Sequence, residues 1–224
     1  MERNTRAQAP HGGQPIVLGG APLDQAAGAV ILVHGRGATA QNILPLGSEL
    51  GRSDLAYLAP QASGQTWYPY SFMAPVERNE PGRSSALAML ADLVQRLEAE
   101  ADIPPERVFL TGFSQGACLT VEFAARHPRR YGGVIAFTGG LIGPEGALGG
   151  YEGSLDGTPV FLGAGDPDPH VPWYRVEESA DILRQLGAEV ETRRYPGMPH
   201  TIVHDEVEAA RQLIENALAV RTAS

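Results

Sequence analysis

Short apolar runs that alternate with longer helical segments constrain the fold of this chain more than any other feature. Runs rich in β-branched and aromatic residues, bounded by Gly or Pro, predict strands at 29–34, 55–59, 107–113, 133–139, 159–165 and 188–196. Segments with apolar residues at helical spacing predict helices at 40–50, 84–101, 115–126, 173–186 and 203–220. This alternation is typical of an α/β fold in which helices cover both faces of a mostly parallel sheet.

The ends of these segments add detail to the predicted sheet. The run 188–196 is the most polar, so we expect it at an edge, and the run 15–20 is a candidate for a further edge strand. Ser84 is the candidate N-cap of the longest helix. Two irregular stretches, 60–83 and 140–158, are longer than simple connections need, which is typical of functional loops.

Length and composition indicate one domain. A chain of 224 residues with 43% hydrophobic residues can bury one substantial core and is short for two. We therefore expect a domain over 14–224, after a flexible segment over 1–13, with no stable membrane insertion. The net charge of −9 argues against a nucleic-acid partner, and the single cysteine, Cys118, fits a reducing, cytoplasmic location.

The segment 107–126 carries the clearest chemical signal. An apolar strand runs into Gly112-Phe113-Ser114-Gln115-Gly116 and then directly into a helix. In this G-x-S-x-G arrangement a tight turn projects a nucleophilic serine, and glycines relieve the crowding on both sides. Two glycines could flank a serine by chance, because the chain holds 27 glycines, but the strand before and the helix after favour a nucleophile. The main-chain N–H of Gln115 is then one donor to an oxyanion.

The second oxyanion donor is predicted in the loop after the run 29–34. Here His34-Gly35-Arg36-Gly37 would offer the main-chain N–H of Arg36, while its side chain is free to reach solvent or substrate. The same glycines also fit the G-x-G-x-x-A pattern of a dinucleotide-binding oxidoreductase. That interpretation needs an acid at the end of the next strand, whereas Asp54 precedes that strand.

The acid and the base of a Ser-Asp-His triad are predicted in two later loops. Asp168 lies in the Pro-stiffened loop after the run 159–165, and we prefer it to Asp166, which could instead bind backbone N–H groups. His200 follows the last strand and is preferred as the base over His170, in the acid's own loop, and over His204, in the last helix. His200 and His204 stand four residues apart, but no third metal ligand is evident, so we expect neither a metal nor a cofactor.

The aromatic residues of the stretch 60–83 have two open interpretations. Trp67, Tyr68 and Phe72 could wall an acyl or aromatic pocket and bind substrate, or they could anchor the long loop to the body of the protein. We expect a small-molecule ester as the partner. A homodimer is a further expectation, from an apolar loop beside the site.

These motifs together resemble the phospholipase/carboxylesterase family of α/β hydrolases, small serine esterases related to acyl-protein thioesterases. The resemblance runs from about residue 30 to 207 and is carried by HGRGATA, GFSQG, FTGGLIGP, DPDPHVP and YPGMPH. It implies a compact α/β-hydrolase fold without a large lid, with Ser114, Asp168 and His200 as the triad and Arg36 with Gln115 as the oxyanion hole. It also implies hydrolysis of carboxylic esters, thioesters or lysophospholipids. The loop 65–72 departs from the thioesterase branch, so depalmitoylation is not carried over.

One alternative from a different functional class remains beside the oxidoreductase. A chain that keeps this fold but lacks the chemistry would be a hydrolase-like binding protein. All three triad residue types stand at suitable places in this sequence, which favours the esterase.

Overall fold

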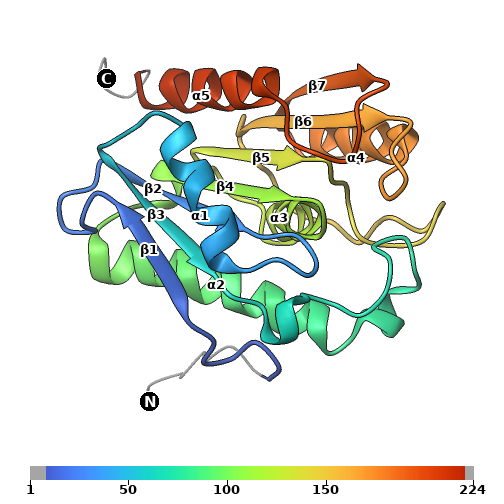
Figure 1. Cartoon of the computed structure of the whole chain (residues 1–224), viewed down its shortest axis with the longest axis horizontal. Coiled ribbons are helices and arrows are strands. Elements are labelled where there is room, and N and C mark those ends of the chain that lie inside the picture. The colour runs from blue at the N-terminus through green and yellow to red at the C-terminus, as the bar shows by residue number, and fades with distance from the viewer. Residues whose placement is uncertain (1–8, 220–224) are drawn as a thin grey trace.

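The structure is a computed structural model that describes residues 9–219. Seven strands form one sheet in the order β1-β3-β2-β4-β5-β6-β7 (Figure 1). All neighbouring strands are parallel except β1, which pairs antiparallel with β3. The strands are β1 Ile16–Gly20, β2 Gly28–Val33, β3 Leu55–Pro60, β4 Val108–Phe113, β5 Gly133–Phe137, β6 Pro159–Asp166 and β7 Glu189–Pro196.

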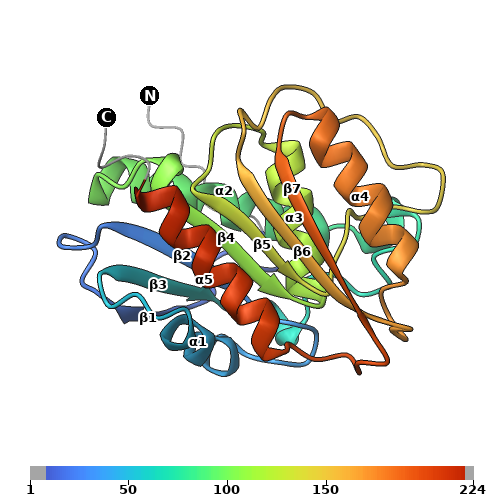
Figure 2. The same cartoon turned by 90° about the horizontal axis from the view of Figure 1, so that it is seen from above.

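Five α-helices cover the two faces of this sheet, and the α/β fold class is confirmed. The helices are α1 Ala40–Glu49, α2 Gly82–Ala101, α3 Gln115–Arg126, α4 Trp173–Gln185 and α5 His204–Ala219. Helices α1 and α5 pack into one apolar cluster, and α2, α3 and α4 pack into the other, on the opposite face (Figure 2). Short 3-10 turns occur at Ser63–Gln65, Val76–Asn79 and Pro105–Arg107.

Burial follows the apolar pattern of the sequence. Every residue of β2 and β3 is buried, because both strands lie inside the sheet with helices on both sides. Each Leu, Ile or Val side chain buried there stabilises the fold by roughly 1.5–3 kcal/mol relative to exposure. Strand β7 has no buried residue and forms one edge, as predicted, while β1 forms the other.

The start of α2 differs from the prediction that Ser84 caps it. The helix begins at Gly82, and Pro81 occupies the N-cap position with no side-chain cap. The carboxylate of Glu80 accepts the main-chain N–H of Ser84 at 3.0 Å. Ser84 therefore lies inside the first turn, where an acidic side chain from outside the helix satisfies its N–H.

Part of the segment 1–13, which we expect to be flexible, packs against the body of the protein; residues 1–8 lie outside the described structure. His11 is 1% exposed, and its main-chain N–H donates to Ser85 Oγ at 3.0 Å. Its Nδ1 accepts from Ser63 N at 3.1 Å, so Nε2 carries the proton and donates to Trp67 O at 2.9 Å. Burial lowers the pKa of His11, in keeping with this neutral form. Composition gave no sign of these distant partners.

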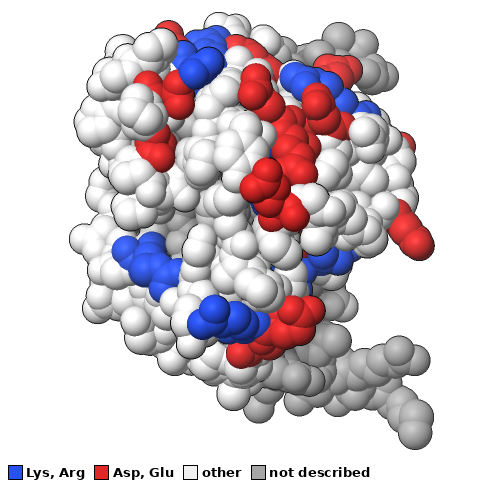
Figure 3. All heavy atoms as spheres, turned by 90° about the vertical axis from the view of Figure 1, so that its right-hand side faces the viewer, with Lys and Arg blue, Asp and Glu red and all other residues white. Residues whose placement is uncertain are grey.

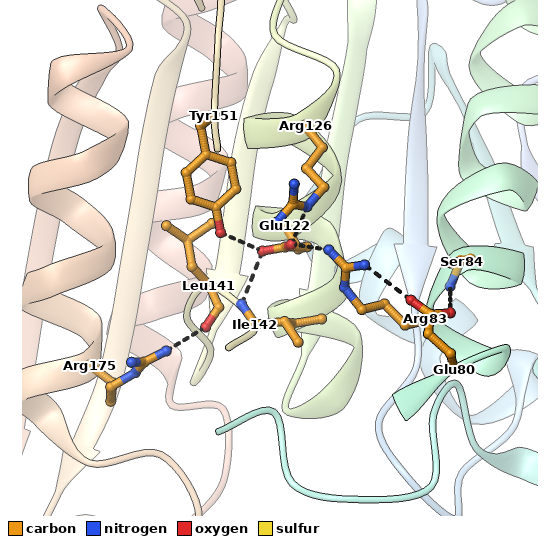
Figure 4. A network of polar contacts seen from close by, with 9 residues as sticks. All are labelled: Glu80, Arg83, Ser84, Glu122, Arg126, Leu141, Ile142, Tyr151 and Arg175. Atoms are coloured by element: carbon orange, nitrogen blue, oxygen red, sulfur yellow. Dashed lines mark hydrogen bonds and ion pairs between the residues drawn. The ribbon is translucent and has the colours of Figure 1, made fainter. Parts of the chain in front are cut away.

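A buried carboxylate connects the helices behind the sheet (Figure 4). Glu122 of α3 is fully buried, and its Oε1 accepts from Arg83 Nη2 at 2.6 Å and from Arg126 Nε at 2.5 Å. Its Oε2 accepts from Tyr151 Oη at 2.9 Å and from the main-chain N–H of Ile142 at 3.0 Å. One side chain thus ties α2 and α3 to the irregular stretch 140–158.

Arg175 of α4 holds the same stretch from the other side. Its buried guanidinium donates to the carbonyl oxygens of Leu141 at 2.8 Å and Gly143 at 3.0 Å. The main-chain N–H of Gly143 donates in turn to Phe72 O at 2.8 Å. The two long irregular stretches of the sequence therefore meet and are fixed by buried polar groups.

We predict that Glu122→Gln destabilises the fold by about 3 kcal/mol, because the buried Arg83 loses the closer of its two carboxylate partners and keeps only Glu80, at 3.2 Å. The matched control is Glu100→Gln, which breaks a pair between side chains that are 64% and 52% exposed and should cost less than about 0.5 kcal/mol. Urea denaturation followed by circular dichroism measures both variants. Equal losses of unfolding free energy in the two variants would contradict the structural role of Glu122.

Candidate active site

The turn between β4 and α3 has the conformation that its sequence predicts. Ser114 lies in the left-handed region with φ 55° and ψ −119°, which is costly for a residue with a side chain. A Cβ on Gly112 would lie 2.5 Å from the main chain of Gly116, and a Cβ on Gly116 would lie 2.0 Å from Val33 O. Glycine is therefore required on both sides of Ser114, which explains the G-x-S-x-G spacing.

Three side chains from separate loops meet beside this turn. Ser114 Oγ lies 2.8 Å from His200 Nε2, and His200 Nδ1 lies 2.7 Å from Asp168 Oδ2. Asp168 follows β6, His200 follows β7, and Ser114 follows β4. The C-terminal ends of these parallel strands lie at one edge of the sheet, so residues far apart in sequence come together there.

The surroundings of Asp168 keep it ionised. Burial by itself raises the pKa of this carboxyl, but main-chain N–H groups of Val171 and His170, with the ring of His200, more than offset burial and lower it. Both main-chain donors reach Oδ1 at 2.8 Å. Because a carboxylate only accepts, Nδ1 of His200 carries the proton, and Nε2 of the neutral ring is free to accept from Ser114.

The alternatives considered for the acid and the base lie elsewhere. Asp166 forms an ion pair with Arg194, whose Nε donates to it at 2.8 Å. The ring of His170 packs edge-on against His200 with ring centres 4.9 Å apart. His204 is 84% exposed at the first residue of α5. None of these side chains has a hydrogen bond to Ser114 within residues 9–219.

Arg36 and Gln115 flank Ser114 at the two predicted donor positions. Gln115 is the first residue of α3, whose main-chain N–H has no acceptor within the helix. Arg36 lies in the loop after β2, where a Cβ on Gly35 would come within 3.4 Å of Ser114 Cβ. The two main-chain N–H groups thus belong to segments that pack closely against the serine.

Both side chains have a role that the sequence did not reveal. The Arg36 side chain is exposed and borders the hollow that contains Ser114, as expected, but it is also held in place: it donates to Thr66 Oγ1 at 3.2 Å, Pro69 O at 2.9 Å and Tyr70 O at 2.6 Å. In the same way, Gln115 Oε1 accepts from Trp67 N at 2.9 Å and its Nε2 donates to Tyr68 O at 2.8 Å. The loop 60–83 is therefore held by the same residues that flank Ser114.

The three aromatic residues of that loop divide into two groups. Trp67 is fully buried, its Nε1 donates to His34 O at 2.8 Å, and its ring packs against the rings of His11 and His34. Trp67 therefore anchors the loop. Tyr68 and Phe72 are also mostly buried, but both line a hollow of about 450 Å³ that includes Ser114.

This hollow, termed here the Ser114 hollow, opens at the C-terminal edge of the sheet. Its lining residues are Gly35, Arg36, Ala38, Tyr68, Pro69, Tyr70, Ser71, Phe72, Phe113, Ser114, Gln115, Cys118, His170, Val171 and His200. Cys118 is buried, and burial raises the pKa of its thiol to about 12, so it is no competing nucleophile at neutral pH. On the side of the molecule toward which these strands point, uncharged residues occupy much of the centre and acidic ones gather above it (Figure 3).

Comparison with known proteins identifies the fold's relatives. The sequence profile described as phospholipase/carboxylesterase matches residues 20–218. The chain belongs to the phospholipase/carboxylesterase family. A crystal structure of a family member from Dyadobacter fermentans DSM 18053 has 49% sequence identity and a TM-score of 0.88, over 93% of this chain and 99% of that one. The crystal structure of esterase PE8 has 26% identity and a TM-score of 0.74, over 91% of this chain and 98% of that one.

Curated relatives in this family include acyl-protein thioesterases. Acyl-protein thioesterase 1 of Debaryomyces hansenii is 26% identical over 68% of this chain and 67% of its own length. The protein of the same name from Saccharomyces cerevisiae is 34% identical over 54% of this chain and 55% of its own length. The second of these alignments spans little more than half of the relative. Family membership makes the chain a hydrolase of the carboxylesterase kind, as the sequence motifs predicted.

Neither a metal-binding cluster nor a membrane-spanning helix occurs within the described residues 9–219. No group of three or more His, Cys, Asp and Glu side chains in it could hold a metal ion. No helix among these residues has the length and apolar character needed to cross a membrane.

Sequence reasoning missed Glu206, a buried carboxylate at the start of α5. Its Oε2 accepts from Val203 N at 2.9 Å, which fixes the segment between His200 and the helix. Its Oε1 has no hydrogen-bond partner among the described residues and faces Gly163, where a Cβ would lie 2.3 Å from it. Burial raises the pKa of Glu206 to about 7.

We predict that Glu206→Gln becomes more stable than wild type as the pH rises. The ordinary pKa is 4.5, so the unfolded chain loses its proton before the folded one. The contribution of Glu206 to the free energy of unfolding is therefore fully present below about pH 4.5. It is lost as the pH rises toward 7, by about 3 kcal/mol in total, and the Gln variant does not undergo this loss. The measurement is the free energy of unfolding of both proteins from pH 5 to pH 8.

The control for this prediction is Glu208→Gln, a more exposed carboxylate on the same helix. Its stability should follow that of wild type across the pH range. Parallel curves for wild type and Glu206→Gln would show that Glu206 titrates normally.

Proposed function

We propose that this chain is a serine esterase that hydrolyses carboxylic esters through an acyl-enzyme on Ser114. The observation that carries the proposal is the continuous relay from Ser114 Oγ to His200 Nε2 at 2.8 Å and from His200 Nδ1 to Asp168 at 2.7 Å. This arrangement of hydroxyl, imidazole and carboxylate is the constellation that activates a serine for acyl transfer.

The first half of the reaction forms the acyl-enzyme. Nε2 of His200 takes the proton of Ser114 as Oγ attacks the carbonyl carbon of the ester. The negative charge that develops on the carbonyl oxygen is stabilised by the main-chain N–H groups of Arg36 and Gln115. His200 then gives the proton to the oxygen of the departing alcohol as the carbon–oxygen bond breaks.

The second half releases the acid. A water molecule takes the place of the alcohol, His200 removes a proton from it, and the resulting nucleophile attacks the acyl carbon. Collapse of that intermediate returns the proton to Ser114 Oγ. Asp168 keeps its charge throughout, because its N–H donors lower its pKa, and it stabilises the imidazolium form of His200.

The lining of the Ser114 hollow suits an uncharged acyl group. Tyr68 and Phe72 supply an aromatic wall, and Trp67 acts behind them by holding the loop in place. Thioesters and lysophospholipids share the same acyl chemistry and are further candidates. We expect action in a reducing compartment such as the cytoplasm, since the single cysteine is free. A homodimer stays a prediction.

The alternative of a dinucleotide-binding oxidoreductase has less support. Its pattern needs an acidic side chain at the C-terminal end of the next strand. Asp54 stands before β3 and forms a two-point ion pair with Arg52 at 2.6 and 2.8 Å. It therefore lies at the opposite end of that strand from Ser114.

We predict that Ser114→Ala loses turnover of p-nitrophenyl butyrate by on the order of 10³-fold or more, because no other group in the hollow can form the acyl-enzyme. The variant should also lose labelling by a fluorophosphonate probe while it keeps the melting temperature of wild type to within a few degrees. Equal rates for the two proteins would contradict the esterase. Absence of turnover and labelling in folded wild type would favour a binding protein.

We predict that Asp168→Asn lowers kcat by about 10³ to 10⁴-fold, because the main-chain N–H groups of His170 and Val171 hold the amide oxygen, so the amide NH2 faces Nδ1 of His200 and favours the wrong tautomer. The matched control is Asp166→Asn, two residues earlier, which breaks only the ion pair with Arg194 and should change kcat less than about threefold. Steady-state kinetics with p-nitrophenyl butyrate measures both variants. The reverse ranking would move the role of the acid to Asp166.

A further inference from the structure

A second hollow, of about 540 Å³, adjoins the Ser114 hollow. It lies between α1 and the start of α5 and is termed here the α1–α5 groove. Ile43 and Leu46 of α1 and Val207 of α5, all buried, contribute to its lining together with the partly buried Ile202. Because α1 and α5 cover one face of the sheet and α3 the other, the two hollows extend away from the strand ends in different directions.

The two hollows adjoin each other beside His200. They share four lining residues: Gly35, Ala38, Phe113 and His200. The ring of Phe113 packs against that of His200 with centres 5.0 Å apart, so these two residues form a common ridge. A molecule bound across this ridge would occupy both hollows at once.

The nucleophile and the two oxyanion donors of the proposed reaction lie in only one of the hollows. Ser114, Gln115 and Arg36 line the Ser114 hollow and do not line the α1–α5 groove. The carbonyl group of an ester must therefore sit in the Ser114 hollow, with its oxygen toward the main-chain donors. The alcohol oxygen must instead lie within reach of His200 Nε2, which protonates it as the bond breaks.

We propose that the α1–α5 groove binds the alcohol part of the ester, while the acyl part occupies the Ser114 hollow. This inference rests on the proposed esterase function and extends it to the class of leaving group. The serine–acyl bond forms as the acyl–alcohol bond breaks, and the proton of Ser114 passes through His200 to the alcohol oxygen. The alcohol then leaves along the groove.

The lining of the groove selects the kind of alcohol. Ile43, Leu46, Ile202 and Val207 give it an aliphatic floor. Glu49 is among its lining residues, and no lysine or arginine is. A neutral hydrocarbon alcohol is therefore favoured over a phosphate-bearing one such as the headgroup of a lysophospholipid, whose anion would meet a carboxylate and, of basic side chains, only histidines.

The experiment uses two series of esters that vary one half at a time. Ethyl, butyl and hexyl acetates lengthen only the alcohol, and ethyl acetate, butyrate and hexanoate lengthen only the acyl group. For each protein and each series, the kcat/KM of the longest ester is divided by the kcat/KM of the shortest. This quotient is called the alcohol ratio for the three acetates and the acyl ratio for the three ethyl esters. This within-protein ratio removes any general effect of a variant on the catalytic rate.

The variant Ile202→Trp narrows the groove, and Phe72→Trp narrows the Ser114 hollow. We expect Ile202→Trp to lower the alcohol ratio about tenfold and leave the acyl ratio within twofold, and Phe72→Trp to do the reverse. Leu18→Trp is the matched control, because Leu18 is 59% exposed on β1, outside both hollows, and it should move neither ratio. If Ile202→Trp does not fold, Ile202→Ala should still lower the alcohol ratio, by about threefold, through lost apolar contact.

Two results would overturn the inference. One is a change of the acyl ratio in Ile202→Trp with the alcohol ratio unmoved, and the other is no change in either ratio. If, in that second case, the mass of Ile202→Trp by sedimentation also differs from that of wild type, the groove would instead be a contact between copies of the chain.

Failure of the esterase itself has a different signature. Ser114→Ala would then turn over ethyl acetate as fast as wild type, which would remove the basis of the groove's role as well. Turnover that depends on Ser114, with an alcohol ratio that does not respond to Ile202→Trp, would refute the groove alone.

Discussion

The close approach between Gly116 and the carbonyl of Val33 is the contact on which the site depends. It lets α3 begin immediately beside the end of β2, and it forces Ser114 into a backbone conformation with φ 55°. Main-chain hydrogen bonds of the sheet and of α3 hold that strained turn on both sides, so the surrounding structure offsets its cost. The loop that carries Arg36 leaves β2 at this point, so the main-chain N–H groups of Arg36 and Gln115 belong to adjacent segments.

The rest of the site is positioned by polar groups that act over long distances in sequence. Strand order brings the loops after β4, β6 and β7 to one edge, but it does not fix the long stretches that border the hollow. Those are held by Arg36 and Gln115 from the front and by Glu122 and Arg175 from behind. Because each of these side chains donates to or accepts from main-chain atoms, the shape of the hollow depends on few residues outside the loop itself.

The sequence predicted most of the framework because the framework is local. Apolar runs and helical spacing located every strand and α-helix of residues 9–219 to within a few residues, though not the short 3-10 turns, and the order of loops brought Ser114, Asp168 and His200 together as candidates. The interactions it missed join distant positions. Trp67 could be a pocket wall or an anchor until its ring was found against His11 and His34, and the start of α2 depended on Glu80 outside the helix. Neither residue type nor spacing encodes such pairs, since they follow from the tertiary fold.

In the proposed reaction, the segment from His200 to the start of α5 joins stability, catalysis and substrate selection in a few residues. Val203 is held by the buried carboxylate of Glu206, and between it and His200 lies Ile202, on the floor of the α1–α5 groove. The hydrogen bond between Val203 N and Glu206 therefore supports three features: the position of His200, the shape of the groove and the start of α5. This support is itself costly, because Glu206 is buried with one oxygen unpartnered in the described structure. The buried carboxylate of Glu206 thus lowers the stability of the fold, and in return it fixes the segment between β7 and α5 that carries His200.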